Sequence, residues 1–126
     1  MKVYLCGGIH GLSDQEANEW RQRAKALLGD VSILDPMRRD YRAVKDENID
    51  SFVQGDLREI AESDTLLVNA TRPSWGTAME IVYARILGRR IVAFVGSPTS
   101  VSPWLRYHCD AITSSLEEAV ARVIDP

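Results

Sequence analysis

The chain lacks the features typical of membrane-spanning, nucleic-acid-binding and metal-binding proteins. No apolar run approaches the roughly 20 residues of a membrane-spanning helix. The net charge of −3 and a pI near 5.3 give no support for binding a nucleic-acid backbone. The two histidines and two cysteines have no metal-ligand spacing: His10, His108, Cys6 and Cys109. We therefore expect no membrane contact, no nucleic-acid partner and no metal.

Two cysteines are too few for a disulfide framework. Cys6 falls within an expected core strand, which predicts a buried free thiol and a reducing compartment. Residues 1–9 are too short for a signal peptide and run directly into a glycine turn. We expect a cytoplasmic protein.

The common nucleotide-binding loops are also absent. Neither GxGxxG nor GxxxxGK[ST] occurs, so a dinucleotide or ATP cofactor has no support, and we expect no cofactor. The tight turn Gly7–Gly11 still brings backbone N–H groups close to the start of a helix, where a ligand can bind them.

Short apolar strands alternate with helices along the 126 residues. We expect strands at 2–6, 31–34, 65–68, 91–95 and 110–113, and helices at 13–28, 49–61, 77–87 and 114–123. This order predicts βαβ units and a parallel sheet, so residues 1–126 are expected to form one doubly wound α/β domain. Segments 35–48 and 96–103 are expected to be loops. The first contains Arg38, Arg39, Asp40 and Arg42, a run of charges of the kind that is usually solvated.

Glu80 is notable because it is an acid at the start of an otherwise apolar helix. The polar turn 69–76 joins the strand 65–68 to this helix, at the edge where open parallel sheets bind ligands. We interpret Glu80, on the first turn, as a nucleophile that the helix dipole keeps ionised. The spacing from Thr77 to Glu80 also fits a capping box, a structural role that the sequence leaves open.

Asp56 falls on the apolar face of helix 49–61. Helical spacing places on that face Ile49, Phe52, Val53, Leu57 and Ile60. We expect Asp56 to be half-buried with a raised pKa, or else to lie at the edge of the face with its carboxylate in water. Beside Glu80 it would complete the pair of a retaining glycosidase, one ionised nucleophile and one protonatable acid. Tyr4, near the end of the first strand, either packs in the core or holds a carboxylate through its hydroxyl.

Three stretches in this order resemble the nucleoside 2-deoxyribosyltransferase superfamily, and within it the 2'-deoxynucleoside 5'-monophosphate N-glycosidases. They are Val3–Gly11, Gly55–Leu57, and Pro73–Gly76 followed by Glu80. The resemblance covers nearly the whole chain. It implies a Rossmann- or flavodoxin-like sheet of five parallel strands, a homodimer or larger homo-oligomer, and a small nucleoside or nucleotide substrate.

The resemblance also implies roles for individual residues. Glu80 matches the nucleophile, Asp56 the acid that acts on the leaving base, and Tyr4 the residue that orients the nucleophile. Ser102 matches a serine that contacts phosphate from the neighbouring subunit. The further substrate-binding candidates are Gly7, Gly8, Ile9, His10, Ser74, Trp75 and Gly76.

The stretch Pro73–Gly76 matches the branch that holds a 5'-phosphate. That branch tends to have serine at the position of Gly8 and arginine at that of His10, so the preference between nucleosides and monophosphates stays open. Arg38, Arg39 and Arg42 are alternative sources of positive charge. Trp75 either stacks on the base or covers the pocket.

The implied reaction is a double displacement. Glu80 attacks the anomeric carbon, Asp56 or a water it positions protonates the departing base, and water or a second base resolves the glycosyl ester. Two alternatives remain. A cytokinin-type phosphoribohydrolase shares the Gly-Thr-x-x-Glu run but has a Pro-Gly-Gly segment before it. A non-catalytic nucleotide sensor on the same fold would not need Tyr4, Asp56 and Glu80 together.

Overall fold

The computed structural model describes residues 1–39, 48–97 and 100–126. Five strands form one sheet: β1 (Lys2–Cys6), β2 (Ser32–Leu34), β3 (Thr65–Asn69), β4 (Arg90–Phe94) and β5 (Ala111–Thr113). Five α-helices and a 3-10 helix connect them: α1 (Asp14–Leu28), η1 (Pro36–Arg39), α2 (Ile49–Glu62), α3 (Trp75–Ile86), α4 (Pro103–His108) and α5 (Leu116–Ile124). Every strand pairing is parallel, in the order β2-β1-β3-β4-β5.

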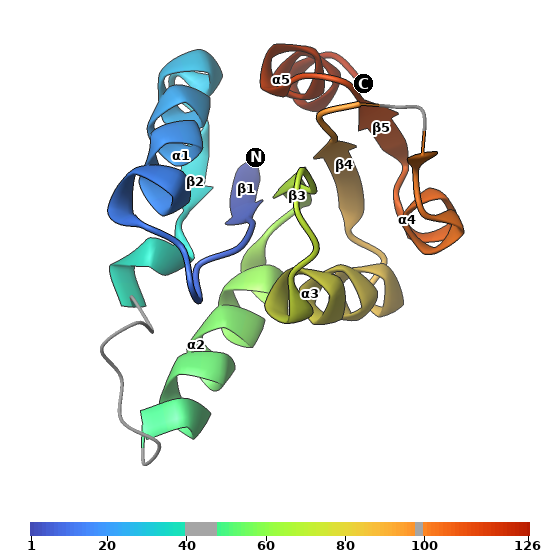
Figure 1. Ribbon diagram of the computed structural model, residues 1–126. Helices are drawn as coiled ribbons and strands as arrows, with labels where there is room; N and C mark the ends of the chain where they lie inside the picture. The colour runs from blue at the N-terminus through green and yellow to red at the C-terminus, as the bar shows by residue number, and fades with distance from the viewer. Residues whose placement is uncertain (40–47, 98–99) are drawn as a thin grey trace.

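Helices cover both faces of the sheet (Figure 1). Each face has its own hydrophobic core. On one face α1 and α5 pack through residues such as Trp20 and Val120 against Leu5 and Leu67. On the other face α2 and α3 pack through Ile60 and Ile81. The central strands are covered on both faces, which is why they read as continuous apolar runs. The predicted α/β doubly wound fold with a five-stranded parallel sheet is confirmed.

The strand order changes direction between β1 and β3. From β1 the chain moves outward to β2 and then returns to form β3 on the other side of β1. At such a point neighbouring connections leave on opposite faces of the sheet and open a crevice at the carboxyl ends of the strands. Tyr4 pairs with Leu66, and Cys6 with Val68, along this boundary. The fold thus places the end of β1 beside that crevice.

The structure corrects the expected start of the third helix. α3 begins at Trp75 and its N-cap is Ser74, whose hydroxyl accepts the Thr77 N–H. Glu80 therefore lies in the second turn, and Thr77 is not a capping residue. The last helix also begins later than the expected residue 114: α5 starts at Leu116, and its N-cap Ser115 accepts the Glu118 N–H.

Two further expectations differ from the structure. Helix α4 was not expected, since a six-residue helix has too little periodicity to be recognised. On α2 the expected apolar face is rotated: Ile49 and Val53 are about half exposed, while Asp56 and Glu59 are buried. Of the charged run in segment 35–48, Arg38 and Arg39 lie on η1, and Asp40 and Arg42 lie outside the described residues. No described helix has the length and apolar character that crossing a membrane requires.

A candidate active site at the β1 and β3 boundary

Glu80 is held by two donors from β1. The Tyr4 hydroxyl donates to Glu80 Oε2, and the Cys6 thiol lies 3.6 Å from Glu80 Oε1. Tyr4 and Cys6 are two residues apart, so both project from the same face of the strand. Glu80 reaches them because it lies one helical turn from two buried residues of α3, Thr77 and Ala84. Of the two roles left open for Tyr4, the structure supports both: it packs in the core and holds the carboxylate.

Burial dominates the electrostatics of Glu80. It raises the pKa of Glu80 to about 7, although the hydrogen bonds from Tyr4 and Cys6 act in the opposite direction. The charge of Asp56 adds to the rise. The expectation that the helix dipole keeps Glu80 ionised is wrong, because the residue lies beyond the first turn, where that field is concentrated. Burial also raises the pKa of Tyr4, so its hydroxyl stays protonated and continues to donate.

Asp56 is buried on α2, with only 5% of its surface exposed, so the alternative that its carboxylate lies in water is wrong. Burial raises the pKa of Asp56 to about 6, against the opposing effect of Arg39. Arg39 Nη2 lies 3.0 Å from Asp56 Oδ1 and 2.7 Å from Glu59 Oε2. The expected contrast between an ionised Glu80 and a protonatable Asp56 is therefore not found. Both carboxyls have raised pKa values, because both are buried.

The tight turn Gly7–Gly11, which follows β1 and is called the first turn below, is fixed by a buried arginine. Arg21 on α1 is fully buried, donates to the Gly7 carbonyl at 3.0 Å, and pairs with Asp35 at 3.4 Å. A Cβ at Gly7 would lie 2.7 Å from the Trp20 ring, so only glycine fits there. A Cβ at Gly8 would lie 3.8 Å from the Ser74 side chain, which places the turn next to the start of α3.

The remaining candidates of the first turn differ in exposure. Ile9 is buried. His10 is exposed at the end of the turn.

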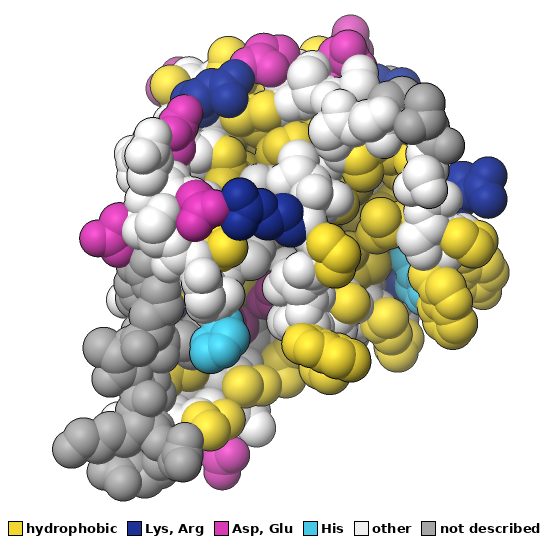
Figure 2. All heavy atoms as spheres, in the orientation of Figure 1, with side chains coloured by type: hydrophobic (Ala, Val, Ile, Leu, Met, Phe, Trp, Pro, Cys, Tyr) yellow, Lys and Arg dark blue, Asp and Glu magenta, His cyan; other side chains and the backbone are white. Residues whose placement is uncertain are grey.

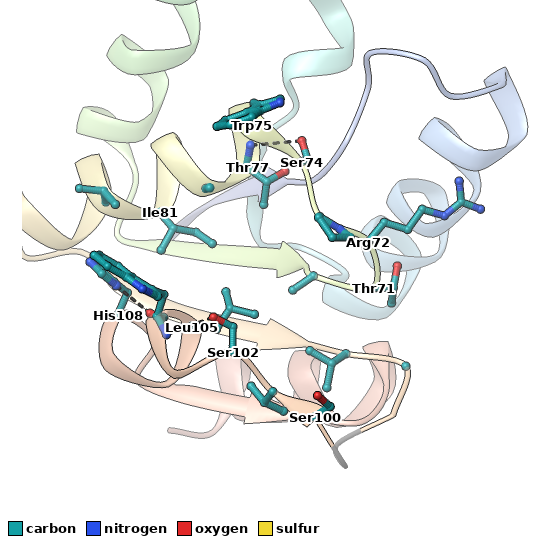
Figure 3. A pocket seen from close by; sticks show the side chains of 18 of the residues that line it. Thr71, Arg72, Ser74, Trp75, Thr77, Ile81, Ser100, Ser102, Leu105 and His108 are labelled. Atoms are coloured by element: carbon teal, nitrogen blue, oxygen red, sulfur yellow. Dashed lines mark hydrogen bonds between the residues drawn. The ribbon is translucent and has the colours of Figure 1, made fainter.

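A cavity of about 890 Å³ lies on the β4 side of α3. Ser74 and Trp75 line one wall, and Ser102 and His108 line the other (Figure 3). Both serines are N-caps, since Ser102 accepts the Trp104 N–H at 3.2 Å. Glu80, Asp56 and Tyr4 are not among the lining residues. The candidate residues therefore fall into two groups: Glu80, Asp56 and Tyr4 lie outside the cavity, whereas Ser74, Trp75 and Ser102 line it. Ser74 also lies next to Gly8.

Helices α3 and α4 expose an apolar surface beside this cavity (Figure 2). We call it the α3/α4 surface, and it consists of Trp75, Met79, Val82, Ile86, Trp104 and Tyr107. The α3 members follow the spacing of one helical stripe. Trp75 is 85% exposed and Ile86 is 76% exposed. Although α3 is apolar along most of its length, it is therefore not buried on all sides, and Trp75 both lines the cavity and is exposed.

The sequence did not predict the contacts that three residues make at the site. Cys6 was expected to be a buried free thiol, which is confirmed, but strand period also places it beside Tyr4 on the face that meets Glu80. Arg21 lies on the inward stripe of α1 with Ala17, Ala24 and Leu28, so its spacing is a usable signal of burial. Arg39 has no such signal, because it reaches Asp56 only through the tertiary fold.

A doubly wound sheet with two buried carboxyls and a tyrosine at its switch point is typical of proteins that bind a small molecule at the carboxyl edge of the strands. A family profile narrows the class: that of nucleoside 2-deoxyribosyltransferases matches residues 3–119. The chain belongs to the nucleoside 2-deoxyribosyltransferase family. Among the described residues no cluster of three or more His, Cys, Asp or Glu side chains is arranged to hold a metal ion.

Solved structures share this fold at low sequence identity. A 2-deoxyribosyltransferase of Bacillus psychrosaccharolyticus has a TM-score of 0.77 and 16% identity, and the match covers 95% of this chain and 90% of that one. A conserved protein of Enterococcus faecalis V583 has a TM-score of 0.72 and 15% identity, with 98% and 96% covered. A CMP N-glycosidase of Clostridium botulinum has a TM-score of 0.67 and 14% identity, with 98% and 99% covered. No curated protein sequence matches the chain.

Proposed function

We propose that the protein cleaves the N-glycosidic bond of 2'-deoxynucleosides or their 5'-monophosphates through a covalent intermediate on Glu80. One observation carries the proposal: the Tyr4 hydroxyl donates to Glu80 at the β1 and β3 boundary, with the charge of Asp56 close enough to raise the Glu80 pKa. Family membership supports the reaction type. The deoxyribose then passes to water, as in an N-glycosidase, or to a second base, as in a transferase.

The first half-reaction exchanges one bond at the anomeric carbon for another. A Glu80 carboxylate oxygen bonds to that carbon while its bond to the base nitrogen breaks, and the electron pair leaves with the base. Asp56 gives its proton to the departing base. Tyr4 keeps Glu80 in position by donating to one carboxylate oxygen. Because the other oxygen of Glu80 accepts from Cys6, the carboxylate has little rotational freedom.

The second half-reaction restores the carboxylate. Water or a second base attacks the same carbon, the ester oxygen leaves as the Glu80 carboxylate, and Asp56 takes up the proton of the nucleophile. Two displacements on one carbon give overall retention of configuration. Substrates without a 2'-hydroxyl reach the oxocarbenium-like transition state more easily, which favours deoxyribose.

The proposal predicts a bell-shaped dependence of rate on pH. Attack needs the ionised form of Glu80, whose fraction grows as pH rises through its pKa of about 7. Proton donation needs the protonated form of Asp56, whose fraction declines as pH rises through its pKa of about 6, and the rate follows the product of the two fractions. The maximum is therefore expected between these values. A rate that rises without limit above neutral pH would contradict the role of Asp56.

The direct test is chromatography of dAMP, dCMP, dGMP and dTMP beside their nucleosides, with and without a second free base. Base release without an acceptor identifies a glycosidase, and a new nucleoside formed only with the second base identifies a transferase. Glu80→Ala should abolish turnover and leave the fold intact, whereas Glu62→Ala, an exposed control on α2, should retain activity. Binding without consumption of any substrate would favour a nucleotide sensor instead.

We further propose that Ser74 and the backbone of Gly76 help hold a 5'-phosphate at the start of α3, with the first turn alongside. The N-terminus of this 12-residue helix supplies N–H donors and a favourable dipole for an anion. The Thr77 hydroxyl there is buried and has no hydrogen-bond partner in the structure. Ser74→Ala is expected to raise KM for monophosphates more than for nucleosides. An equal rise for both would contradict a phosphate contact.

The α3/α4 surface supports the proposal of a homodimer or larger homo-oligomer in which Ser102 reaches the neighbouring site. Exposed tryptophans and aliphatic side chains on adjacent helices are typical of a surface that another chain covers. Ile86→Glu is expected to shift sedimentation towards the monomer. A monomeric wild-type protein would contradict this proposal.

Subunit mixing tests the reach of Ser102. The Glu80→Ala and Ser102→Ala proteins are each impaired on their own. In a mixed dimer, the Ser102→Ala chain supplies an intact Glu80 and the Glu80→Ala chain supplies an intact Ser102, so one of the two sites is complete. Mixing should therefore restore a wild-type KM for monophosphates in part of the sites. No restoration in a confirmed mixed dimer would place Ser102 in its own chain's site.

A further inference from the structure

Arg39 is the only described cation that contacts the Asp56 carboxylate directly. Its Nη2 lies 3.0 Å from Asp56 Oδ1, and the same guanidinium makes two contacts to Glu59, at 2.7 and 3.0 Å. Arg39 ends η1, immediately after the edge strand β2, and its side chain is only 26% exposed. A planar guanidinium held by two carboxylates has little freedom, so it fixes the position of both.

Gly55 makes room for this guanidinium. A Cβ at position 55 would lie 2.7 Å from Arg39 Nε and 3.0 Å from its Cδ. Glycine is a poor choice in the interior of a helix, where it disfavours folding relative to alanine. Its presence in the middle of α2, next to Asp56, is explained by the packing of Arg39 across it.

We propose that Arg39 is a positioning residue: it holds the Asp56 carboxylate in place and favours its charged form, and position 55 is glycine because any side chain would displace the guanidinium. The proposal rests on the proposed function, because that function assigns the proton-transfer step to Asp56. An acid buried beside Glu80 with no counter-charge would keep its proton and would be too weak to donate it at neutral pH. Arg39 brings the acid strength of Asp56 into a usable range.

Other charged groups also face Asp56, and they set the background for this effect. Glu59 lies on the same helix, Glu80 comes from α3, Tyr4 from β1 and Arg21 from α1. Glu59 raises the pKa of Asp56 and Arg21 lowers it, but both effects rank below those of Arg39. Removing Arg39 is therefore expected to leave burial as the dominant influence.

The test is an NMR titration of the substrate-free protein, with 13C-labelled aspartate and with Asp56→Asn to assign the signal. Arg39→Gln should move the Asp56 midpoint upward by roughly one pH unit or more. Arg39→Lys keeps the charge and should recover much of that shift. Arg38→Gln is the matched control, because Arg38 contacts Glu59 and no Asp56 contact is found for it; it should move the midpoint far less.

Gly55→Ala provides a second, independent perturbation. It removes no charge and improves helix propensity, so the variant should fold even if Arg39→Gln does not. It should move the Asp56 midpoint in the same direction by displacing the guanidinium. An unchanged midpoint in both Arg39→Gln and Gly55→Ala would overturn the proposal, as would an equal shift in Arg38→Gln.

Activity provides a separate readout. In Arg39→Gln the limb of the pH profile that reports Asp56 should move to higher pH, and kcat should fall more than KM changes. The titration does not depend on turnover. If the wild-type protein consumes no deoxynucleoside or monophosphate while the midpoint still shifts, the proposed function fails and the Arg39 contact stands. If turnover is found and the midpoint does not shift, only the Arg39 proposal fails.

Discussion

Replacing Glu80 with glutamine should stabilise the protein, and by an amount that grows with pH. Folding raises the Glu80 pKa from 4.5 to about 7, chiefly because the carboxylate is buried. The folded state then binds a proton that the unfolded state has already lost between these two values. Glu80 therefore contributes to the free energy of unfolding at low pH, and this contribution is lost as pH rises from 4.5 to about 7. Glutamine has nearly the same shape and cannot ionise, so it avoids the loss.

The magnitude follows from the size of the pKa change. A rise of between two and three pH units at about 1.4 kcal/mol per unit gives a ceiling of roughly 3 kcal/mol. Glu80 keeps some exposure, so we expect about 2–3 kcal/mol above neutral pH and almost none near pH 4.5. In a domain of this size that corresponds to a Tm increase of roughly 8–12 °C.

Urea unfolding of wild type and Glu80→Gln at a series of pH values measures this difference. Groups that titrate alike in both proteins cancel, so the pH dependence of the difference isolates Glu80 and its coupling to Asp56. Glu62→Gln, at an exposed position, controls for the loss of one carboxyl from the total charge. A stability difference that is the same at acid and alkaline pH would refute the argument from burial, and so would a wild type that is the more stable protein at alkaline pH.

Three further predictions concern Tyr4, Ser102 and Trp20. Tyr4→Phe removes the donor to Glu80 Oε2, so kcat should fall roughly 10–100-fold, as expected for a hydrogen bond to a charged group, and the limb that reports Glu80 should move to higher pH. Steady-state kinetics over a pH range checks this, and an unmoved limb would contradict it. Ser102→Ala should raise KM more for monophosphates than for nucleosides; an equal effect on both would exclude a phosphate role. Trp20→Ala should cost about 3–5 kcal/mol of stability in urea unfolding, because Trp20 packs edge-on against Phe94 at 5.8 Å and underlies the first turn. A loss below about 1 kcal/mol would mean that the core closes over the gap.

Much of the fold could be predicted because local patterns and packing agree in the central elements. The strands β1, β3 and β4 are apolar on both faces, and α1 has a Ser13 capping box at one end and Gly29 in a left-handed conformation at the other. These signals lie within a few residues of the structure they cause. The helix α4 and the true cap of α3 were missed because several short polar segments fit equally well, and only packing selects among them.

The candidate site could be predicted in part for a related reason. Tyr4, Asp56 and Glu80 each occupy a conspicuous position in the sequence, and the family resemblance named all three. Their protonation could not be predicted, because it depends on how deeply each carboxyl is buried and on which cation reaches it. Two of the features that determine it, the position of Glu80 in the second turn and the reach of Arg39 across Gly55, emerge only when the chain is folded.

By itself the sequence determined the alternation of strands and helices, and with it a parallel, doubly wound sheet whose candidate ligand-binding edge lies at the carboxyl ends of the strands. This is so because hydrophobic periodicity and turn chemistry act over short stretches of chain. The tertiary structure alone decided that Asp56 meets Arg39, that Glu80 accepts from both Tyr4 and Cys6, and that α3 and α4 expose an apolar surface. Those contacts join residues from distant parts of the chain, and their energies depend on burial, which no local pattern records.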